Sequence, residues 1–280
     1  MARDIVDDRL IMALHVRALS RAGLQHDTSA EHTAVQAGTL AALLEGAYDG
    51  DATLAELLRL GDLGLGTVQH LDGELVMLDG AAWAVRSDGR VDALDGSVRT
   101  PFAVVCRFRA DASVRCEEPC TLDELCAHID RVVGSGTHAP NRQGARNDEI
   151  VAVRATGSFS GLRLRSVARQ HHPYPPLRDV VAHQTEWHVG SAAGTIVGFR
   201  FPDTLSGVDV PGHHLHFLSD DRLTGGHVLE LTMLEGDVQV QTCDELHVEL
   251  PPGVTLGEPG AVDRDEVRRV EGGGRPASAS

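Results

Sequence analysis

The sequence contains no lysine, and all 25 of its basic residues are arginine. Enzymes that activate a carbonyl group as a Schiff base, including PLP enzymes and amine-dependent decarboxylases of β-keto acids, need a lysine amine as nucleophile. The absence of lysine excludes that chemistry. A reaction that needs an electron sink must therefore use a metal ion or a bound cofactor.

The sequence also lacks a long apolar run. A membrane-spanning helix needs roughly 18 or more consecutive apolar residues, and no segment of this chain reaches that length. The first residues are acidic, and the short apolar run at 10–14 is followed by His15 and Arg17, so no signal peptide is expected. The five cysteines are an odd number without a regular framework, which is consistent with a reducing compartment. We therefore expect a cytoplasmic protein with no membrane partner.

Three of the cysteines, Cys116, Cys120 and Cys126, lie close together in the sequence. Such a group suggests a metal, but the spacing contains no C-x-x-C pair. We interpret them as free thiols.

Positive charge is scarce overall. The 25 basic residues are outnumbered by 41 acidic ones, which gives a formal net charge of −16. A chain with this balance repels phosphate backbones and anionic lipid head groups. We expect no nucleic acid partner.

The first half of the chain mixes helix and strand signals. Helices are predicted at 37–45 and 51–60, and Thr121 with Glu124 has the form of a capping box that begins a third helix. Two Asp-Gly pairs between apolar runs predict β-hairpins. The glycine run at 61–66 predicts a close-packed turn.

The second half of the chain predicts strands only, and a polar, glycine-rich segment at 134–147 separates it from the first half. The expected fold class is α/β (α+β) with two domains: an N-terminal mixed β-sheet with helices, and a C-terminal, mostly antiparallel β-sheet that carries the site described next. The predicted boundaries are 1–32 for an N-terminal extension, 33–140 and 141–260 for the two domains, and 261–280 for a C-terminal tail.

Three histidines in the second half have the spacing of a metal site. Residues i and i+2 of a strand share one face, so the side chains of His214 and His216 project together. The following segment, 219–226, is rich in turn formers, and a hairpin would return His227 to the same place. Three neutral imidazoles with an open fourth position are typical of a catalytic zinc site, whereas structural sites usually include cysteines.

Paired histidines on a strand also occur at protein surfaces without a ligand, and this sequence has 15 histidines. The apolar residues Leu215, Phe217 and Leu218 lie among the three candidates and favour a buried hairpin. We interpret His213 and His247 as ordinary polar residues. The pattern therefore favours a metal site in the C-terminal sheet.

Further motifs surround these histidines in the sequence. They are L-L-E-G-A-Y-D-G at 43–50, G-D-L-G-L-G-T at 61–67, L-D-G-E at 71–74, T-P-F-A-V-V at 100–105, R-S-V at 165–167, P-Y-P-P-L at 173–177, H-L-H-F at 214–217, D-D-R at 220–222 and G-G-H-V-L at 225–229. With these motifs, roughly residues 36–250 resemble the α-acetolactate decarboxylase family, whose members convert 2-acetolactate to acetoin. The resemblance implies a homodimeric enzyme with a small-molecule substrate.

The resemblance also implies roles for individual residues. Zinc (Zn²⁺) would be bound by the same three histidines, and it would stabilise the enediolate that remains after carbon dioxide leaves. Glu74 and Glu271 would divide the proton transfers, so that protonation from one face gives a single acetoin enantiomer. Arg165 would bind the substrate carboxylate, and Thr67 would lie on the wall of the substrate pocket. Glu271 would lie on a tail that folds back over the metal.

Local patterns alone give a different interpretation of two of these residues. Glu74 has the context of an exposed acid in a hairpin turn, and Arg165 that of a solvent-facing strand residue. The family resemblance reverses both interpretations.

Two other functions are compatible with the three histidines. The first is a metal-dependent hydrolase with three histidine ligands, in which zinc-bound water attacks the substrate and Glu74 is the base. The second is a non-catalytic, metal-stabilised binding domain on a similar fold.

Overall fold

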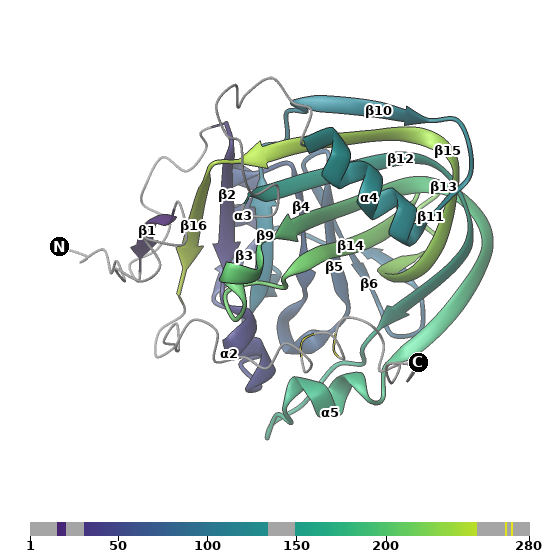
Figure 1. Ribbon diagram of the computed structural model, residues 1–280. Helices are drawn as coiled ribbons and strands as arrows, with labels where there is room; N and C mark the ends of the chain where they lie inside the picture. The colour runs from purple at the N-terminus through teal and green to yellow at the C-terminus, as the bar shows by residue number, and fades with distance from the viewer. Residues whose placement is uncertain (1–15, 21–30, 134–148, 251–266, 268–269, 271–280) are drawn as a thin grey trace, which may run out of the picture.

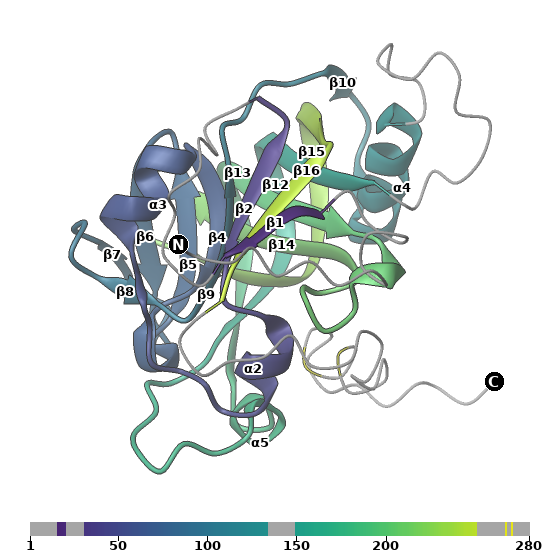
Figure 2. The same cartoon turned by 90° about the vertical axis from the view of Figure 1, so that its left-hand side faces the viewer.

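Two β-sheets packed face to face make up most of the structure, a computed structural model that describes residues 16–20, 31–133, 149–250, 267 and 270 (Figure 1). Helix α3 (Leu54–Leu60) covers the outer face of the first sheet, and α4 (Leu122–Val133) covers that of the second. In Figure 2, α3 lies toward the left of the molecule and α4 toward the right. The fold is therefore α+β with far more strand than helix, which confirms the predicted class.

The first sheet has eight strands and is mixed. In spatial order they are β1 (Val16–Ser20), β16 (Glu245–Glu249), β2 (Thr33–Ala37), β9 (Phe102–Cys106), β4 (Leu63–Thr67), β5 (Glu74–Leu78), β6 (Ala81–Val85) and β7 (Val91–Ala93). β16 runs parallel to both of its neighbours, and the remaining pairs are antiparallel. The turn between β5 and β6 is the predicted Asp-Gly hairpin, with positive φ at both Asp79 and Gly80.

The second sheet is antiparallel, as predicted. Its strands are β10 (Ala112–Cys116), β15 (Gly225–Cys243), β12 (Ile150–Ser166), β13 (Thr185–Phe201) and β14 (Gly212–Ser219), and β11 (Cys120–Thr121) also pairs with β15. β14 additionally pairs with the start of β15. Because β15 pairs with β12 as well, the four strands β12, β13, β14 and β15 form a closed ring of pairings.

The remaining elements are short. They are α2 (Leu40–Leu44), α5 (Leu177–Val181), the two-stranded ribbon of β3 (Ala52–Thr53) with β8 (Arg99–Thr100), and the 3₁₀ turns η1 (Gln69–Leu71) and η2 (Asp203–Leu205). Among the described residues, no helix is long and apolar enough to cross a membrane.

A shared hydrophobic core joins the two sheets. The first sheet contributes Leu65 and Val76 among others, and the second contributes Val197, Phe199 and Leu218. All five are at most 2% exposed. Since alternate residues of a strand face opposite sides, the opposite faces of the same strands pack against the two helices. Each sheet is therefore buried on both faces, which explains why β2, β4, β5 and β9 are apolar without alternation.

Two local predictions were wrong in detail. The glycine run at 61–66 forms most of strand β4 and not a turn, because Gly64 allows the backbone to lie against β9: a Cβ there would be 2.6 Å from the Val104 carbonyl oxygen. The second helix begins after Thr53, whose capping box with Glu56 provides the N-cap in place of Asp51. The capping box of Thr121 and Glu124 is confirmed, with the Thr121 amide donating to the Glu124 carboxylate at 2.8 Å.

The two sheets exchange segments across the predicted domain boundary near residue 140. β10, β11 and α4 precede that boundary but belong to the second sheet or cover it, and β16 follows it but lies in the first sheet. Residues 16–20 of the predicted extension form β1. The division into two domains at these boundaries remains a prediction, and the core shared between the sheets couples them energetically.

We expect Leu65→Ala to lower the free energy of unfolding by about 2–5 kcal/mol, because it removes buried methyl groups from the core between the sheets and leaves a cavity. The measurement is denaturant unfolding followed by circular dichroism. Leu223→Ala is the matched control, since Leu223 is 74% exposed, and it should change stability by less than about 0.5 kcal/mol. Equal effects of the two substitutions would contradict the shared core.

Candidate metal centre and active site

The three predicted histidines converge in the structure. His214 and His216 lie on β14, His227 lies near the start of β15, and His216 and His227 are directly opposite each other across the strand pair. The ring centroids are 5.0 to 5.4 Å apart, and one ligand nitrogen from each ring lies within 4.8 Å of the others. All three residues are buried, at 7%, 0% and 3% exposure. The predicted hairpin and the shared face are therefore confirmed.

Strand register brings Arg165 to the same place. Arg165 of β12 is the cross-strand partner of His227, and His227 is the partner of His216. Cross-strand partners on one face have Cβ atoms about 4.5–5.5 Å apart. The closed ring of β12 to β15 thus places a guanidinium group beside the three imidazoles, although Arg165 lies 49 to 62 residues before them in the sequence.

The first sheet fixes the ring of His216. Its Nδ1 lies 2.9 Å from the carbonyl oxygen of Leu75, the second residue of β5. A carbonyl only accepts hydrogen bonds, so Nδ1 carries the hydrogen and the lone pair of the neutral ring is on Nε2. This Nε2 faces the Glu74 carboxylate, 3.5 Å from Oε2.

Burial keeps the imidazoles of His214 and His216 neutral. It lowers the pKa of His216 well below its usual value, with a further contribution from His214. Burial, followed by the positive charge of Arg165, lowers the pKa of His214 to about 3. A neutral imidazole is the form that binds a metal ion.

The geometry at His216 fits a divalent cation. The neutral ring and the Glu74 carboxylate direct electron-rich atoms toward each other, and a cation bound at Nε2 would offset that repulsion. The Leu75 carbonyl has the usual role of a partner that orients a metal-binding histidine. The three histidines together therefore form a site that could hold a metal ion.

Glu74 and Arg165 form a buried ion pair next to the histidines. Arg165 Nη1 donates to Glu74 Oε1 at 3.1 Å, and the two side chains are only 6% and 9% exposed. Glu74 reaches this position because it is the first residue of β5, directly opposite Thr67 at the end of β4. The hydroxyl group of Thr67 donates to the Gly73 carbonyl at 3.1 Å, which ties the two strand ends together.

A pocket opens beside these residues. Thr67, Glu74, Arg165 and His214 all line it, so it brings four of the predicted site residues to one space. The rest of its wall is mainly apolar and consists of Leu40, Leu43, Gly66, Leu71, Phe102, Val167, Leu177, Val181, Val210 and Val270. A concave, largely apolar pocket with a few convergent polar groups is typical of a small-molecule site.

Glu271 lies outside the described residues. The residue before it, Val270, is 3% exposed and lines the pocket, and Val267 packs in the same hydrophobic cluster.

Other parts of the site were not predicted from the sequence. Much of the apolar wall comes from α2, α5, the first residue of β9 and the residue after β12, and no local motif marks these residues as neighbours. The sequence predicts that His213 is an ordinary polar residue. In the structure its side chain is only 14% exposed, and its Nε2 lies 3.3 Å from Oδ1 of Asp130 on α4. The signal in the sequence was its position next to His214, which places the His213 side chain on the opposite face of the same strand.

Comparisons with known proteins agree with this geometry. The sequence profile of the alpha-acetolactate decarboxylase family matches residues 35–256. An alpha-acetolactate decarboxylase from Methylococcus capsulatus is 37% identical over 263 residues, which cover 93% of this chain and 96% of the relative. One from Methanosarcina mazei is 39% identical over 216 residues, covering 77% of this chain and 71% of the relative.

A solved structure shows the same fold. The crystal structure of alpha-acetolactate decarboxylase from Bacillus subtilis strain 168 superposes with a TM-score of 0.77 at 30% sequence identity, covering 86% of this chain and 99% of that one. The profile match and the identities over most of both chains lead to one conclusion. This chain belongs to the alpha-acetolactate decarboxylase family.

Proposed function

We propose that this enzyme converts 2-acetolactate to acetoin and carbon dioxide with a zinc ion held by His214, His216 and His227. The observation that supports this proposal is the buried histidine triad beside the Glu74–Arg165 ion pair, next to a pocket that Glu74, Arg165 and His214 line. Family membership supports the decarboxylase reaction itself. The identity of the metal and the division of labour among the residues are the proposed parts.

The ligand set favours zinc. Three imidazoles with a fourth position for substrate are a common arrangement for catalytic Zn²⁺, and neutral ligands leave the full positive charge on the ion. When bound, zinc supplies Lewis-acid stabilisation of the negative charge that decarboxylation leaves on the substrate's ketone oxygen in the enediolate. The absence of lysine makes such an electron sink necessary.

Arg165 binds the substrate carboxylate in this proposal. Its guanidinium group has five N–H donors and stays protonated, and the bond from Nη1 to Glu74 uses one of them. The side chain lines the pocket, so this guanidinium group can pair with a carboxylate that enters there. Thr67 forms part of the wall next to this position.

Glu74 and Glu271 perform the proton transfers in this proposal. The bond between the substrate's carbinol carbon and its carboxylate carbon breaks, carbon dioxide leaves, and the electron pair shifts toward the ketone. One glutamate accepts or shares the hydroxyl proton, and the other delivers a proton to the enediolate carbon from one face, which gives one acetoin enantiomer. Glu74 is suited to this task because Arg165 holds its carboxylate at the histidines.

Two alternative functions lead to different measurements. A metal-dependent hydrolase with Glu74 as base would turn over esters or lactones without releasing carbon dioxide. A metal-stabilised binding domain would lose thermal stability on chelation but consume no substrate. The mainly apolar pocket with one arginine suits a small keto acid as substrate, which favours the decarboxylase over both alternatives. The family match also favours the decarboxylase.

Three further expectations are part of the proposal. They are a cytoplasmic location, a homodimeric state, and the absence of nucleic acid or membrane partners. The acidic net charge of −16 supports the last of these.

Removing the metal should abolish acetoin formation, because the charge on the ketone oxygen loses its stabilisation. The measurement is acetoin production from 2-acetolactate by the purified chain, before and after chelation and after zinc is added back.

We expect His216→Ala to lower kcat/KM by about 100-fold or more, and zinc addition should not rescue it. His188→Ala, an exposed histidine on β13, is the control and should keep full activity. Full acetoin production by the His216 variant would count against the proposal.

Replacing Glu74 by glutamine should lower kcat by about 10²- to 10⁴-fold, because the amide keeps the size of the side chain but cannot exchange a proton. KM should change much less, since the variant leaves Arg165 in place. Glu235→Gln, at an exposed position of β15, is the matched control. An unchanged kcat in the Glu74 variant would remove this residue from the proton-transfer steps.

Replacing Arg165 by lysine should raise KM by about 10-fold or more, because the charge remains but the forked hydrogen bonding to a carboxylate is lost. Steady-state kinetics with 2-acetolactate measure this change. Arg90→Lys is the control: Arg90 forms a 3.0 Å ion pair with Asp92 but its side chain is 65% exposed. If KM stays at its wild-type value in the Arg165 variant, the substrate carboxylate binds elsewhere.

A further inference from the structure

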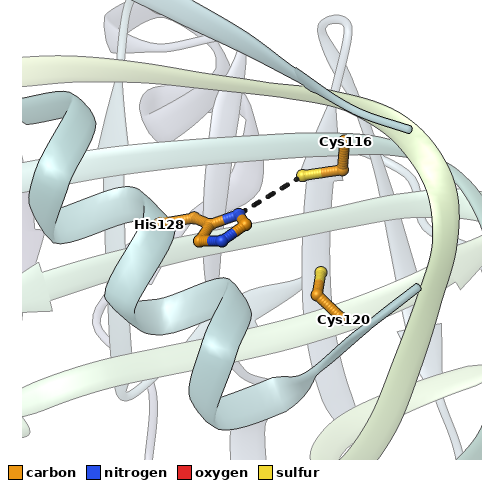
Figure 3. A group of neighbouring side chains, drawn as sticks. All are labelled: Cys116, Cys120 and His128. Atoms are coloured by element: carbon orange, nitrogen blue, oxygen red, sulfur yellow. Dashed lines mark hydrogen bonds between the residues drawn. The ribbon is translucent and has the colours of Figure 1, made fainter. Parts of the chain in front are cut away.

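Two cysteines and one histidine converge at a place far from the site described above. Cys116 is the last residue of β10, Cys120 is the first of β11, and His128 lies on α4 (Figure 3). Their ligand atoms, the two sulfurs and one ring nitrogen, all lie within 4.8 Å of one another. The cysteines are 4% and 5% exposed, and His128 is half-buried.

The local fold explains this convergence. β10 and β11 both pair with β15, where Cys116 is opposite Gly236 and Cys120 is opposite Met233. Both thiols therefore lie opposite nearby residues of β15, three positions apart. α4 begins directly after β11, and Ile129, adjacent to His128, is buried against the sheet. In Figure 3 the ring of His128 points from the helix toward the two thiols.

The distance between one sulfur and the ring nitrogen matches that of a tetrahedral metal site. Bonds of about 2.3 Å to sulfur and 2.0–2.1 Å to nitrogen, at a tetrahedral angle, place the two ligand atoms about 3.6 Å apart. The distance between Cys116 Sγ and His128 Nδ1 is 3.6 Å. A weak hydrogen bond between Cys116 and His128 would explain the 3.6 Å distance. It does not explain why the sulfur of Cys120 also lies within 4.8 Å of both atoms.

We propose that Cys116, Cys120 and His128 form a second metal site, for Zn²⁺ or a metal ion of similar softness. Thiolate and imidazole are the ligands that such ions prefer, and three protein ligands leave one tetrahedral position for water. All five cysteines are free in the structure, so both thiols are available as ligands. This inference does not rest on the proposed function, because it involves none of the residues at the histidine triad.

The proposed ion would hold α4 on the second sheet. It would join the ends of two strands to the middle of the helix that covers them. The same helix carries Asp130, which accepts a hydrogen bond from Arg200 Nη1 at 2.8 Å and lies 3.3 Å from His213, the neighbour of His214. The site therefore has a structural role, and loading it should raise the melting temperature.

Cobalt substitution tests this proposal with a signal that the histidine triad cannot produce. The full chain is purified under reducing conditions, stripped of metal and titrated with Co²⁺. We expect a thiolate-to-cobalt charge-transfer absorption, because only sulfur ligands give rise to it. The band should disappear in Cys116→Ser/Cys120→Ser and remain in Cys126→Ser, the matched control on α4.

A second variant guards against a folding defect in the double mutant. His128→Gln changes a half-buried side chain and should weaken Co²⁺ binding at the thiols by about 10-fold or more, with an unchanged circular dichroism spectrum. Absence of the band in the wild-type chain, or its persistence in the double variant, would overturn the proposal. So would mass spectrometry showing Cys116 and Cys120 joined by a disulfide in the reduced preparation. Acetoin formation is measured in parallel, so failure of the proposed function is scored separately.

Discussion

The hydrogen bond between His216 Nδ1 and the Leu75 carbonyl is the contact on which the active-site geometry depends. It joins β14 of the second sheet to β5 of the first, and both partners are completely buried. The bond assigns the hydrogen to Nδ1 and directs Nε2 toward Glu74, the residue just before Leu75. Because one short stretch of β5 supplies both the orienting carbonyl and the carboxylate, the packing of the two sheets sets the position of the acid relative to the imidazoles.

The three histidines could be placed together from the sequence because their arrangement depends on local properties. The two-residue period of a strand and a turn-rich segment are local properties, so His214, His216 and His227 could be placed together without knowledge of the rest of the fold. The local context of Glu74 and Arg165 suggested exposed residues, and only the family resemblance identified them as part of the site. Both are buried, because each charge is paired with the other and the packing of the first sheet against the second brings β5 and β12 together at this point.

Local sequence patterns do not predict which distant strands pair with each other. The sequence analysis assigns every strand after residue 141 to the C-terminal sheet, yet β15 ends at Cys243 and residues 245–249 pair as β16 in the first sheet. The spacing of Cys116, Cys120 and Cys126 fits no standard metal motif and so predicts free thiols, and it does not point to His128. The helix register held a usable signal, since His128 is three residues after the buried Leu125 and next to the buried Ile129.

The place of β16 between β1 and β2 limits when the first sheet can be finished during synthesis. β2 pairs with β9 on one side and with residues 245–249 on the other. Its second edge therefore has no partner among the described strands until residues 245–249 have been made. An open strand edge of apolar residues invites pairing with other molecules. A nascent chain, or one terminated before residue 245, would expose that edge, so a strand that is made late protects one that is made early.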